Sequence, residues 1–283
     1  MFASDFSGLD SAWLALQRLK VPAKLQFCSD NDPNCKALLN ALHGPGKFFD
    51  EVTDRQPEDE LESDVFVFTP PCQPYSSLGK KKGAGDKRSQ ALDAAQFKVP
   101  QIRRRVFIVA IRKDSCRRAF KWPKPLGEKK LDSVLDPPQP SELGGRLPKG
   151  KRPRELVKDC YKKVWAEGLD PRKVPVAVDI GCTEKFASFG INVSRTLTRA
   201  RGGTGGFWIS NRSRKTTTNE LIRVSGLWPS ELQGWEKHVS KKELGHMLGN
   251  TVPVPLIGEV LQAGMYAAGL ISAKTDFPVN ESQ

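Results

Sequence analysis

The chain has 283 residues and a formal net charge of +13, which allows one buried core with a second domain or a large insertion. No apolar run approaches the length of a membrane span, and the first residues lack the basic and apolar parts of a secretory signal. Its six cysteines form no CxxC pair and no metal-ligand spacing with the three histidines. We therefore expect an intracellular protein with free thiols, no membrane contact and no metal site.

The positive charge is unevenly distributed along the chain. Residues 1–79 hold 6 Lys and Arg against 12 Asp and Glu, a net charge of −6, so residues 80–283 carry +19. Basic runs at 80–88, 103–105 and 149–154 concentrate this charge. A single run of this kind is more often a solvated surface, but a bias over two-thirds of the chain favours a polyanion partner, and nucleic acid is the common one.

The first part of the chain alternates short apolar strands with helical patterns. Helical spacing follows the first strand at Trp13, Leu16 and Leu19, and the strongest strand pattern of the whole chain comes at 106–111. The alternation predicts an α/β fold with a doubly wound, mostly parallel sheet. The segments in order are a strand at 2–6, a helix around 13–19, a strand at 25–28, a helix at 35–42 and a strand at 65–68.

The middle of the chain has a different composition. Residues 113–213 are rich in Pro, Gly, Lys and Arg, with weak strand patterns only at 174–180 and 207–210, which indicates a loop-rich basic insertion or small second domain. Ordered patterns return with a helix starting at 218 and an apolar closing helix within 252–270. We predict three regions: an incomplete core at 1–112, the insertion at 113–213, and a return to the core at 214–283.

A cysteine stands in a proline-rich segment directly after the strand at 65–68. In TPPCQPYSSLG (69–79), the prolines fix φ and remove backbone donors, so the segment is a rigid loop. Cys72 then lies at the carboxyl end of a strand, where open α/β sheets place their ligands. The alternative is that Cys72 is a small buried hydrophobe, as most free cysteines are, and position alone leaves the two interpretations even.

Three further positions resemble parts of a cofactor site. Gly8 lies in a turn between the first strand and the first helix, where a backbone approaches a ligand closely, although the pattern is not GxGxxG. Asp30 ends the second strand, as expected of a carboxylate that holds ribose hydroxyls; a helix N-cap is the equally common alternative. Glu51 or Asp50, after the third strand, is a candidate for reading an adenine amino group.

Five short motifs occur together in a fixed order: Phe6-x-Gly8, Asp30-x-Asp32, Pro71-Cys72-Gln73, Gln101-x-Arg103-x-Arg105 and Gly249-Asn250-Thr251-Val252. In this order the sequence resembles the cytosine-C5 DNA methyltransferases, over nearly the whole chain. The Pro-Cys-Gln loop and the Gln-x-Arg-x-Arg strand entry are highly specific in combination.

The resemblance implies a Rossmann-like methyltransferase that transfers a methyl group from S-adenosylmethionine to C5 of a cytosine flipped out of duplex DNA. Cys72 would be the nucleophile that adds to C6, and Arg103 and Arg105 would pair with phosphate and base and support the thiolate. The same chemistry serves tRNA, so RNA stays open as the substrate, and a eukaryotic member would act in the nucleus. The insertion 113–213 would recognise the target.

The resemblance also assigns the remaining site residues. The cofactor-binding residues would be Phe6, Gly8, Asp30, Glu51, Pro71, Asn250 and Thr251, and the substrate-binding residues Gln73, Ser76 and Gln101.

The sequence departs from the family pattern between the cysteine and the arginines. Family members carry a Glu-Asn-Val segment there, whose glutamate contacts the cytosine; this chain has none, and only 28 residues separate Cys72 from Gln101. A βα unit needs about thirty residues, so the missing strands do not fit. Asp86 and Asp93 are the only carboxylates in the interval, and Asp10 replaces the second glycine of the first motif.

This departure divides the functional hypotheses into two classes. One is an active cytosine-C5 methyltransferase, acting on DNA or tRNA. The other is a catalytically impaired relic or incomplete gene model that acts at most as a basic nucleic-acid-binding protein. Because removal of a positioned acid costs several kcal/mol of transition-state stabilisation, we expect the chain to be slow or inactive.

Overall fold

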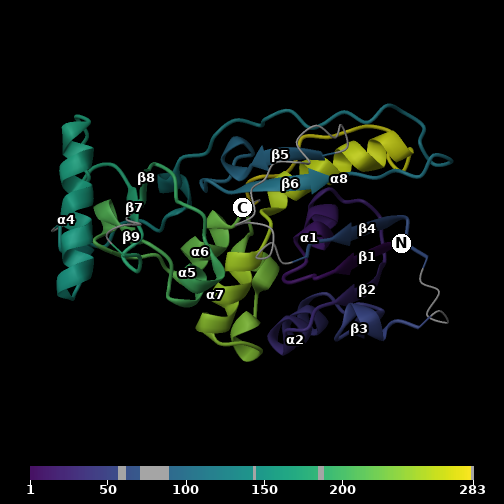
Figure 1. Ribbon diagram of the computed structural model, residues 1–283, viewed down its shortest axis with the longest axis horizontal. Coiled ribbons are helices and arrows are strands. Elements are labelled where there is room, and N and C mark those ends of the chain that lie inside the picture. The colour runs from purple at the N-terminus through teal and green to yellow at the C-terminus, as the bar shows by residue number, and fades with distance from the viewer. Residues whose placement is uncertain (57–61, 71–88, 143–144, 184–187, 282–283) are drawn as a thin grey trace.

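The computed structural model describes residues 1–56, 62–70, 89–142, 145–183 and 188–281 (Figure 1). Its central sheet is parallel, with the strand order β3, β2, β1, β4. The predicted α/β fold with a mostly parallel sheet is therefore confirmed. The strands are β1 (Phe2–Asp5), β2 (Leu25–Ser29), β3 (Lys47–Phe49) and β4 (Val65–Phe68).

Two helices follow the first two strands, as predicted, and pack on one face of this sheet. α1 (Ser11–Arg18) begins at Asp10, whose carboxylate accepts the N–H of Trp13. α2 (Pro33–Leu42) begins with proline, whose fixed φ suits the first helical position. The apolar residues of both helices join those of β1 and β2 in the main core, because their spacing places them on one side of each helix.

A separate two-stranded antiparallel sheet follows, made of β5 (Ser89–Asp93) and β6 (Arg104–Ile108). The closing helix α8 (Val254–Ala268) lies along this hairpin in Figure 1. It contributes Leu256 and Val260 to a second buried cluster with residues of the hairpin segment, and it also packs on α1. The hairpin is thus held to the core by α8.

A small lobe forms at one end of the molecule, with α4 outermost (Figure 1). Apolar residues of α4 pack on an antiparallel sheet with the order β10, β9, β7, β8 and form a core of their own. The weak strands predicted at 174–180 and 207–210 correspond to β7 and β9, whereas α4 was not predicted. The elements are α4 (Lys151–Ala166), β7 (Val176–Val178), β8 (Phe189–Ile191), β9 (Trp208–Ile209) and β10 (Arg214–Lys215).

Three helices lie between this lobe and the parallel sheet: α5 (Arg199–Gly203), α6 (Thr218–Val224) and α7 (Lys241–Asn250). α5 and α7 touch through their backbones, because a Cβ on Gly202 would lie 1.7 Å from the carbonyl oxygen of Gly245. Only glycine permits so close a crossing. Among the described residues, no helix is both long and apolar enough to cross a membrane.

Candidate active site

The turn after β1 has an unusual backbone. Phe6, Gly8 and Asp10 all have positive φ, at 54°, 56° and 48°. The N–H of Gly8 donates to Oδ2 of Asp30 at 2.9 Å, which joins the carboxyl ends of β1 and β2. A Cβ placed on Gly8 would meet no atom within 4 Å, so open space lies beside this backbone. The turn therefore leaves room for a ligand at the carboxyl edge of the sheet.

The carboxylate of Asp30 is shared between two backbone groups. Its Oδ2 accepts from Gly8, and its Oδ1 accepts the N–H of Asp32 at 3.0 Å. The N-cap of α2 is Asp32, whose Oδ1 accepts the N–H of Asn34 at 3.0 Å. The alternative interpretation of Asp30 as the N-cap is therefore wrong, because the helix begins two residues later than that interpretation requires.

The third strand reaches the same edge. The N–H of Asp30 donates to the carbonyl of Phe49 at 3.2 Å, which places the residues after β3 next to the Asp30 turn. Glu51 accepts from the amide of Asn31 at 3.3 Å, whereas Asp50 pairs with Lys36 at 2.8 Å. Of the two predicted alternatives, Glu51 is the one that contacts the segment after β2.

The start of the cysteine segment is tied to the Gly8 turn. Thr69 donates its hydroxyl to the carbonyl of Phe6 at 2.8 Å and its N–H to the carbonyl of Asp5 at 3.2 Å. The rings of Phe6 and Phe68 meet edge to face, with centroids 5.1 Å apart. Thr69 stands three residues before Cys72 in the sequence, so the chain enters the cysteine segment beside this turn. The predicted residues Pro71, Cys72, Gln73 and Ser76 themselves lie outside the described residues.

Three of the other buried cysteines lie in surroundings that disfavour the thiolate. Burial raises the pKa of the Cys28 and Cys35 thiols far above the usual range, and raises the pKa of Cys160 to about 12. A cysteine nucleophile acts as the thiolate, so a raised pKa makes these three poor candidates.

Gln101 and Arg103 make contacts that the sequence reasoning did not predict. Arg103 is 1% exposed; its Nη1 donates to the carbonyl of Leu197 at 2.6 Å and its Nη2 to that of Gly249 at 3.0 Å. Gln101, also buried, donates to the carbonyl of Val224 at 2.9 Å and accepts the N–H of Leu197 at 3.0 Å. The two side chains therefore position the segment before α5 and the last turns of α6 and α7, and direct contact with substrate stays a prediction.

We call the hydrogen bonds of Gln101 and Arg103 to backbone groups the anchor. Asn250 and Thr251 come directly after Gly249, one of the residues that the anchor holds. Thr251 is buried and donates its hydroxyl to the carbonyl of Met247 at 2.9 Å, which ends α7. Asn250, at the last position of α7, is exposed. Because Arg103 holds the carbonyl of Gly249, it fixes the place from which Asn250 reaches outward.

Arg105 and Asp93 take different roles on the hairpin. Arg105 is half-buried, and its Nη1 donates to the carbonyl of Arg104 at 2.7 Å. Asp93 accepts the N–H groups of Ala95 at 3.2 Å and Arg103 at 3.0 Å through one oxygen. Asp93 therefore holds the hairpin's backbone, which disfavours it as a substitute for the missing glutamate. Asp86 lies outside the described residues.

Sequence reasoning missed a buried ion pair at the carboxyl end of β1. Asp5 is 2% exposed and accepts from the hydroxyl of Ser29 and from Nη2 of Arg55, each at 2.6 Å. The guanidinium of Arg55 lies 5.1 Å from the ring centroid of Phe27. An acidic residue directly before the Phe6–Gly8 motif was the available signal. The ion pair between Asp5 and Arg55 therefore lies at the end of β1, directly before the Phe6–Gly8 turn.

Asp10, which stands in place of the second glycine, is also buried. It accepts from the hydroxyl of Ser4 at 2.8 Å and from the N–H of Trp13 at 3.1 Å. Burial raises its pKa to about 6, because these hydrogen bonds only partly replace the lost hydration. Aspartate tolerates the left-handed backbone that the position requires, and it caps α1 in addition.

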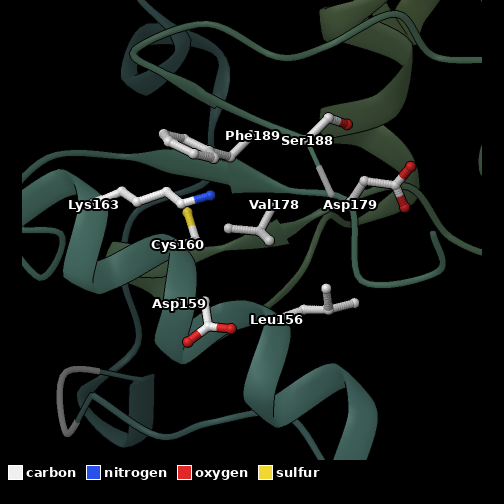
Figure 2. A pocket seen from close by; sticks show the side chains of 8 residues that line it. All are labelled: Leu156, Asp159, Cys160, Lys163, Val178, Asp179, Ser188 and Phe189. Atoms are coloured by element: carbon white, nitrogen blue, oxygen red, sulfur yellow. The ribbon is translucent and has the colours of Figure 1, made fainter. Parts of the chain in front are cut away.

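A hollow in the small lobe lies between α4 and the strands β7 and β8 (Figure 2). Cys160 and Lys163 line it from α4, and Asp179, which pairs with Arg201 at 2.7 Å, lines it from the strand side. None of the predicted site residues lines this hollow. Among the described residues, no group of three or more His, Cys, Asp or Glu side chains is placed to hold a metal ion.

Comparison with known proteins identifies the relatives of this chain. A family model described as C-5 cytosine-specific DNA methylase matches residues 1–92 and 89–264. The Type II methyltransferase M.HaeII of Haemophilus aegyptius is 23% identical over 288 residues, covering 82% of each chain.

A fission-yeast sequence and a fission-yeast crystal structure are also similar to this chain. The tRNA (cytosine(38)-C(5))-methyltransferase of Schizosaccharomyces pombe is 30% identical over 88 residues, or 30% of this chain and 27% of that protein. The crystal structure of the S. pombe Dnmt2 methyltransferase superposes with a TM-score of 0.56 at 15% identity, covering 93% of this chain and 98% of the other. At this identity the superposition shows a shared fold.

Proposed function

Because the chain belongs to the C-5 cytosine-specific DNA methylase family, we propose that it binds S-adenosylmethionine and methylates C5 of a cytosine flipped out of duplex DNA. The observation that carries this proposal is the hydrogen bond between Gly8 and Asp30, with open space beside Gly8. These features form a ligand edge at the carboxyl ends of β1 and β2, and the cysteine segment starts next to it at Thr69.

The residues of this edge fit the cofactor. Gly8 allows close approach of the backbone, Phe6 offers a ring, and Asp30 and Glu51 offer carboxylates for ribose and adenine donors. Asn250 and Pro71 would complete the pocket, with Thr251 holding the end of α7. When bound, S-adenosylmethionine supplies an electrophilic methyl group.

The reacting groups of the chain are assigned by the family motifs. Cys72 adds to C6 of the cytosine as a thiolate, and Arg105 pairs with the base or its phosphate. Arg103 acts as a positioning residue, because its guanidinium holds the backbone on both sides of the site. Gln73 and Ser76 contact the substrate from the cysteine segment. Without the Glu-Asn-Val carboxylate, protonation at N3 of the cytosine has no assigned donor, so we expect slow turnover by the chain alone.

Duplex DNA is the preferred substrate, and tRNA is the second candidate. The similarity to the Type II methyltransferase spans 82% of this chain, whereas the similarity to the tRNA methyltransferase spans 30%. The outer face of α4 carries Lys151, Arg154, Lys158 and Lys162, all exposed, and suits the phosphates of either nucleic acid.

Transfer of the methyl group from labelled S-adenosylmethionine tests the proposal. Cytosine-rich duplex DNA and tRNA are compared as acceptors, with the Cys72→Ser variant as the blank. We expect weak incorporation into DNA that disappears in the variant. Robust incorporation into tRNA alone would replace the DNA assignment. Incorporation equal to the blank on both, with no binding of the labelled cofactor, would support the relic hypothesis.

Cofactor binding is tested separately by calorimetry on the Gly8→Val variant. A valine at φ 56° is strained, and its side chain fills the open space beside the turn. We expect S-adenosylmethionine binding to weaken at least about tenfold, equivalent to 1.4 kcal/mol. The Gly168→Val variant, at another positive-φ glycine with no atom within 4 Å of an added Cβ, is the matched control in the small lobe. Equal loss in both variants would contradict the placement of the cofactor at Gly8.

A further inference from the structure

Among the described residues, β4 is the outermost strand on one side of the parallel sheet. β4 pairs with β1 on one side, and no strand in the described part of the chain pairs with its other edge. Phe66 and Phe68, which point to the same face of β4, are 48% and 55% exposed. Parallel strands are normally buried on both faces, because helices cover them. An apolar strand with an unpaired edge is a template for pairing with another chain, and β4 has such an edge within the described residues.

Strand β6 also combines an unpaired edge with exposed apolar side chains. It pairs with β5, and within the described residues its opposite edge is also without a strand partner. Val106 and Ile108 are 69% and 76% exposed on one face, whereas Phe107 on the other face packs against the main core. The inward residues Val65 and Val67 of β4 pack against that same core. The two open strands therefore rest on one core, each exposing apolar side chains outward.

The family model matches the chain in two parts rather than one. The two parts meet at residues 89–92, where β5 begins. The alignment with the Haemophilus methyltransferase runs over 288 positions but uses only 82% of this 283-residue chain. That relative therefore carries residues for which this chain has no counterpart. The family match is therefore divided between β4 and β6, the two strands that have one edge without a strand partner among the described residues.

We propose that β4 and β6 form a docking site for a segment of a second polypeptide, which bears an apolar β-strand and completes the sheet in trans. Backbone groups of the added strand would pair with the open edges of β4 and β6, and its apolar side chains would cover Phe66 and Val106. The occupant differs from a second copy of this chain, which lacks the same strand. Docking itself does not depend on the proposed function. Only one added consequence rests on the proposed function, namely that the docked segment would carry the missing carboxylate.

The probe is the part of the Haemophilus methyltransferase that lies between its stretches aligned to β4 and β5, fused to a soluble carrier. Binding to the full-length chain is measured by calorimetry, and protection of β4 and β6 amides by hydrogen exchange. We expect saturable binding with new protection at both strands. The Val106→Asp variant should weaken binding at least about tenfold, because the removed contact is that of a buried valine. Trp165→Ser, at a 49% exposed residue of α4, is the matched control and should not change it.

Each outcome has one consequence. Binding with β4 and β6 protection supports the inference, and it does so even if methyl transfer stays absent, in which case the proposed function fails alone. No binding by a folded chain, checked by circular dichroism, overturns the inference. Self-association that Val106→Asp abolishes, without binding of the probe, also overturns it and identifies a second copy as the occupant.

Discussion

Asp10 makes the stability of the protein depend on pH in a direction opposite to that of most carboxylates. Its side chain is buried at 2% exposure, among Ser4, Trp13 and Cys28, and burial raises its pKa from 3.8 to about 6. When the pKa of a carboxyl is higher in the folded protein than in the unfolded chain, the carboxyl stabilises the folded state at pH values below its pKa in the unfolded chain. This contribution is lost as the pH rises through the pKa in the folded protein. The window is therefore about pH 4 to 6.

The magnitude follows from the shift. Two pKa units correspond to about 3 kcal/mol, the cost of keeping the buried carboxylate ionised at neutral pH. In the Asp10→Asn variant, the amide oxygen still accepts from Trp13, and no charge is buried. We expect the variant's free energy of unfolding to equal that of the wild type near pH 4 and to exceed it by up to about 3 kcal/mol at pH 7.

Urea unfolding of both proteins between pH 4 and pH 8 measures this difference. The comparison with the variant is needed because His43 acts in the opposite direction: burial lowers its pKa to about 4, so it favours the folded state more as pH rises through the same window. Both proteins carry His43, and its effect cancels in the difference. A difference that is constant with pH, or that is largest near pH 4, would refute the reasoning.

Two further predictions concern the anchor and the charge. The Arg103→Gln variant should lower the free energy of unfolding by about 2–4 kcal/mol, because it leaves two buried carbonyls without donors. The control in the same denaturation assay is Arg104→Gln, at an exposed neighbouring residue. Equal losses of stability in the two variants would contradict the positioning role of Arg103. Duplex DNA should bind with a steep dependence on salt, because residues 80–283 carry +19, and an affinity that barely changes between low and physiological salt would remove nucleic acid from the proposal.

The fold was predictable where local pattern and packing agree. Short apolar runs separated by helical spacing predicted β1, β2 and β4 within one residue, because apolar runs of this length that alternate with helical patterns are typical of strands in an α/β sheet. α4 was missed for a physical reason. Its buried residues, such as Leu156, Cys160 and Val164, recur at helical spacing, but they sit among so many charges that the segment resembles a solvated linker.

The motifs of the site could be predicted from the sequence. The contacts that some of their side chains make could not. The Gly8 turn and Asp30 meet as their strand-end positions predicted. The burial of Arg103 was not predictable, because its acceptors are carbonyls of Leu197 and Gly249, about a hundred residues or more away in sequence. Backbone groups carry no sequence signature, so a side chain that binds them is indistinguishable beforehand from one that faces a substrate.

That same anchor has a consequence for how such a protein diversifies. The groups held by Gln101 and Arg103 are carbonyls and an N–H, which every residue type other than proline supplies. These hydrogen bonds therefore fix the path of the backbone at Leu197, Val224 and Gly249, and they do not depend on the side chains at these positions. Leu197 and Val224 can change to another apolar residue without loss of these bonds, whereas Gly249 stays glycine because a Cβ there would lie 2.3 Å from the carbonyl oxygen of Thr198.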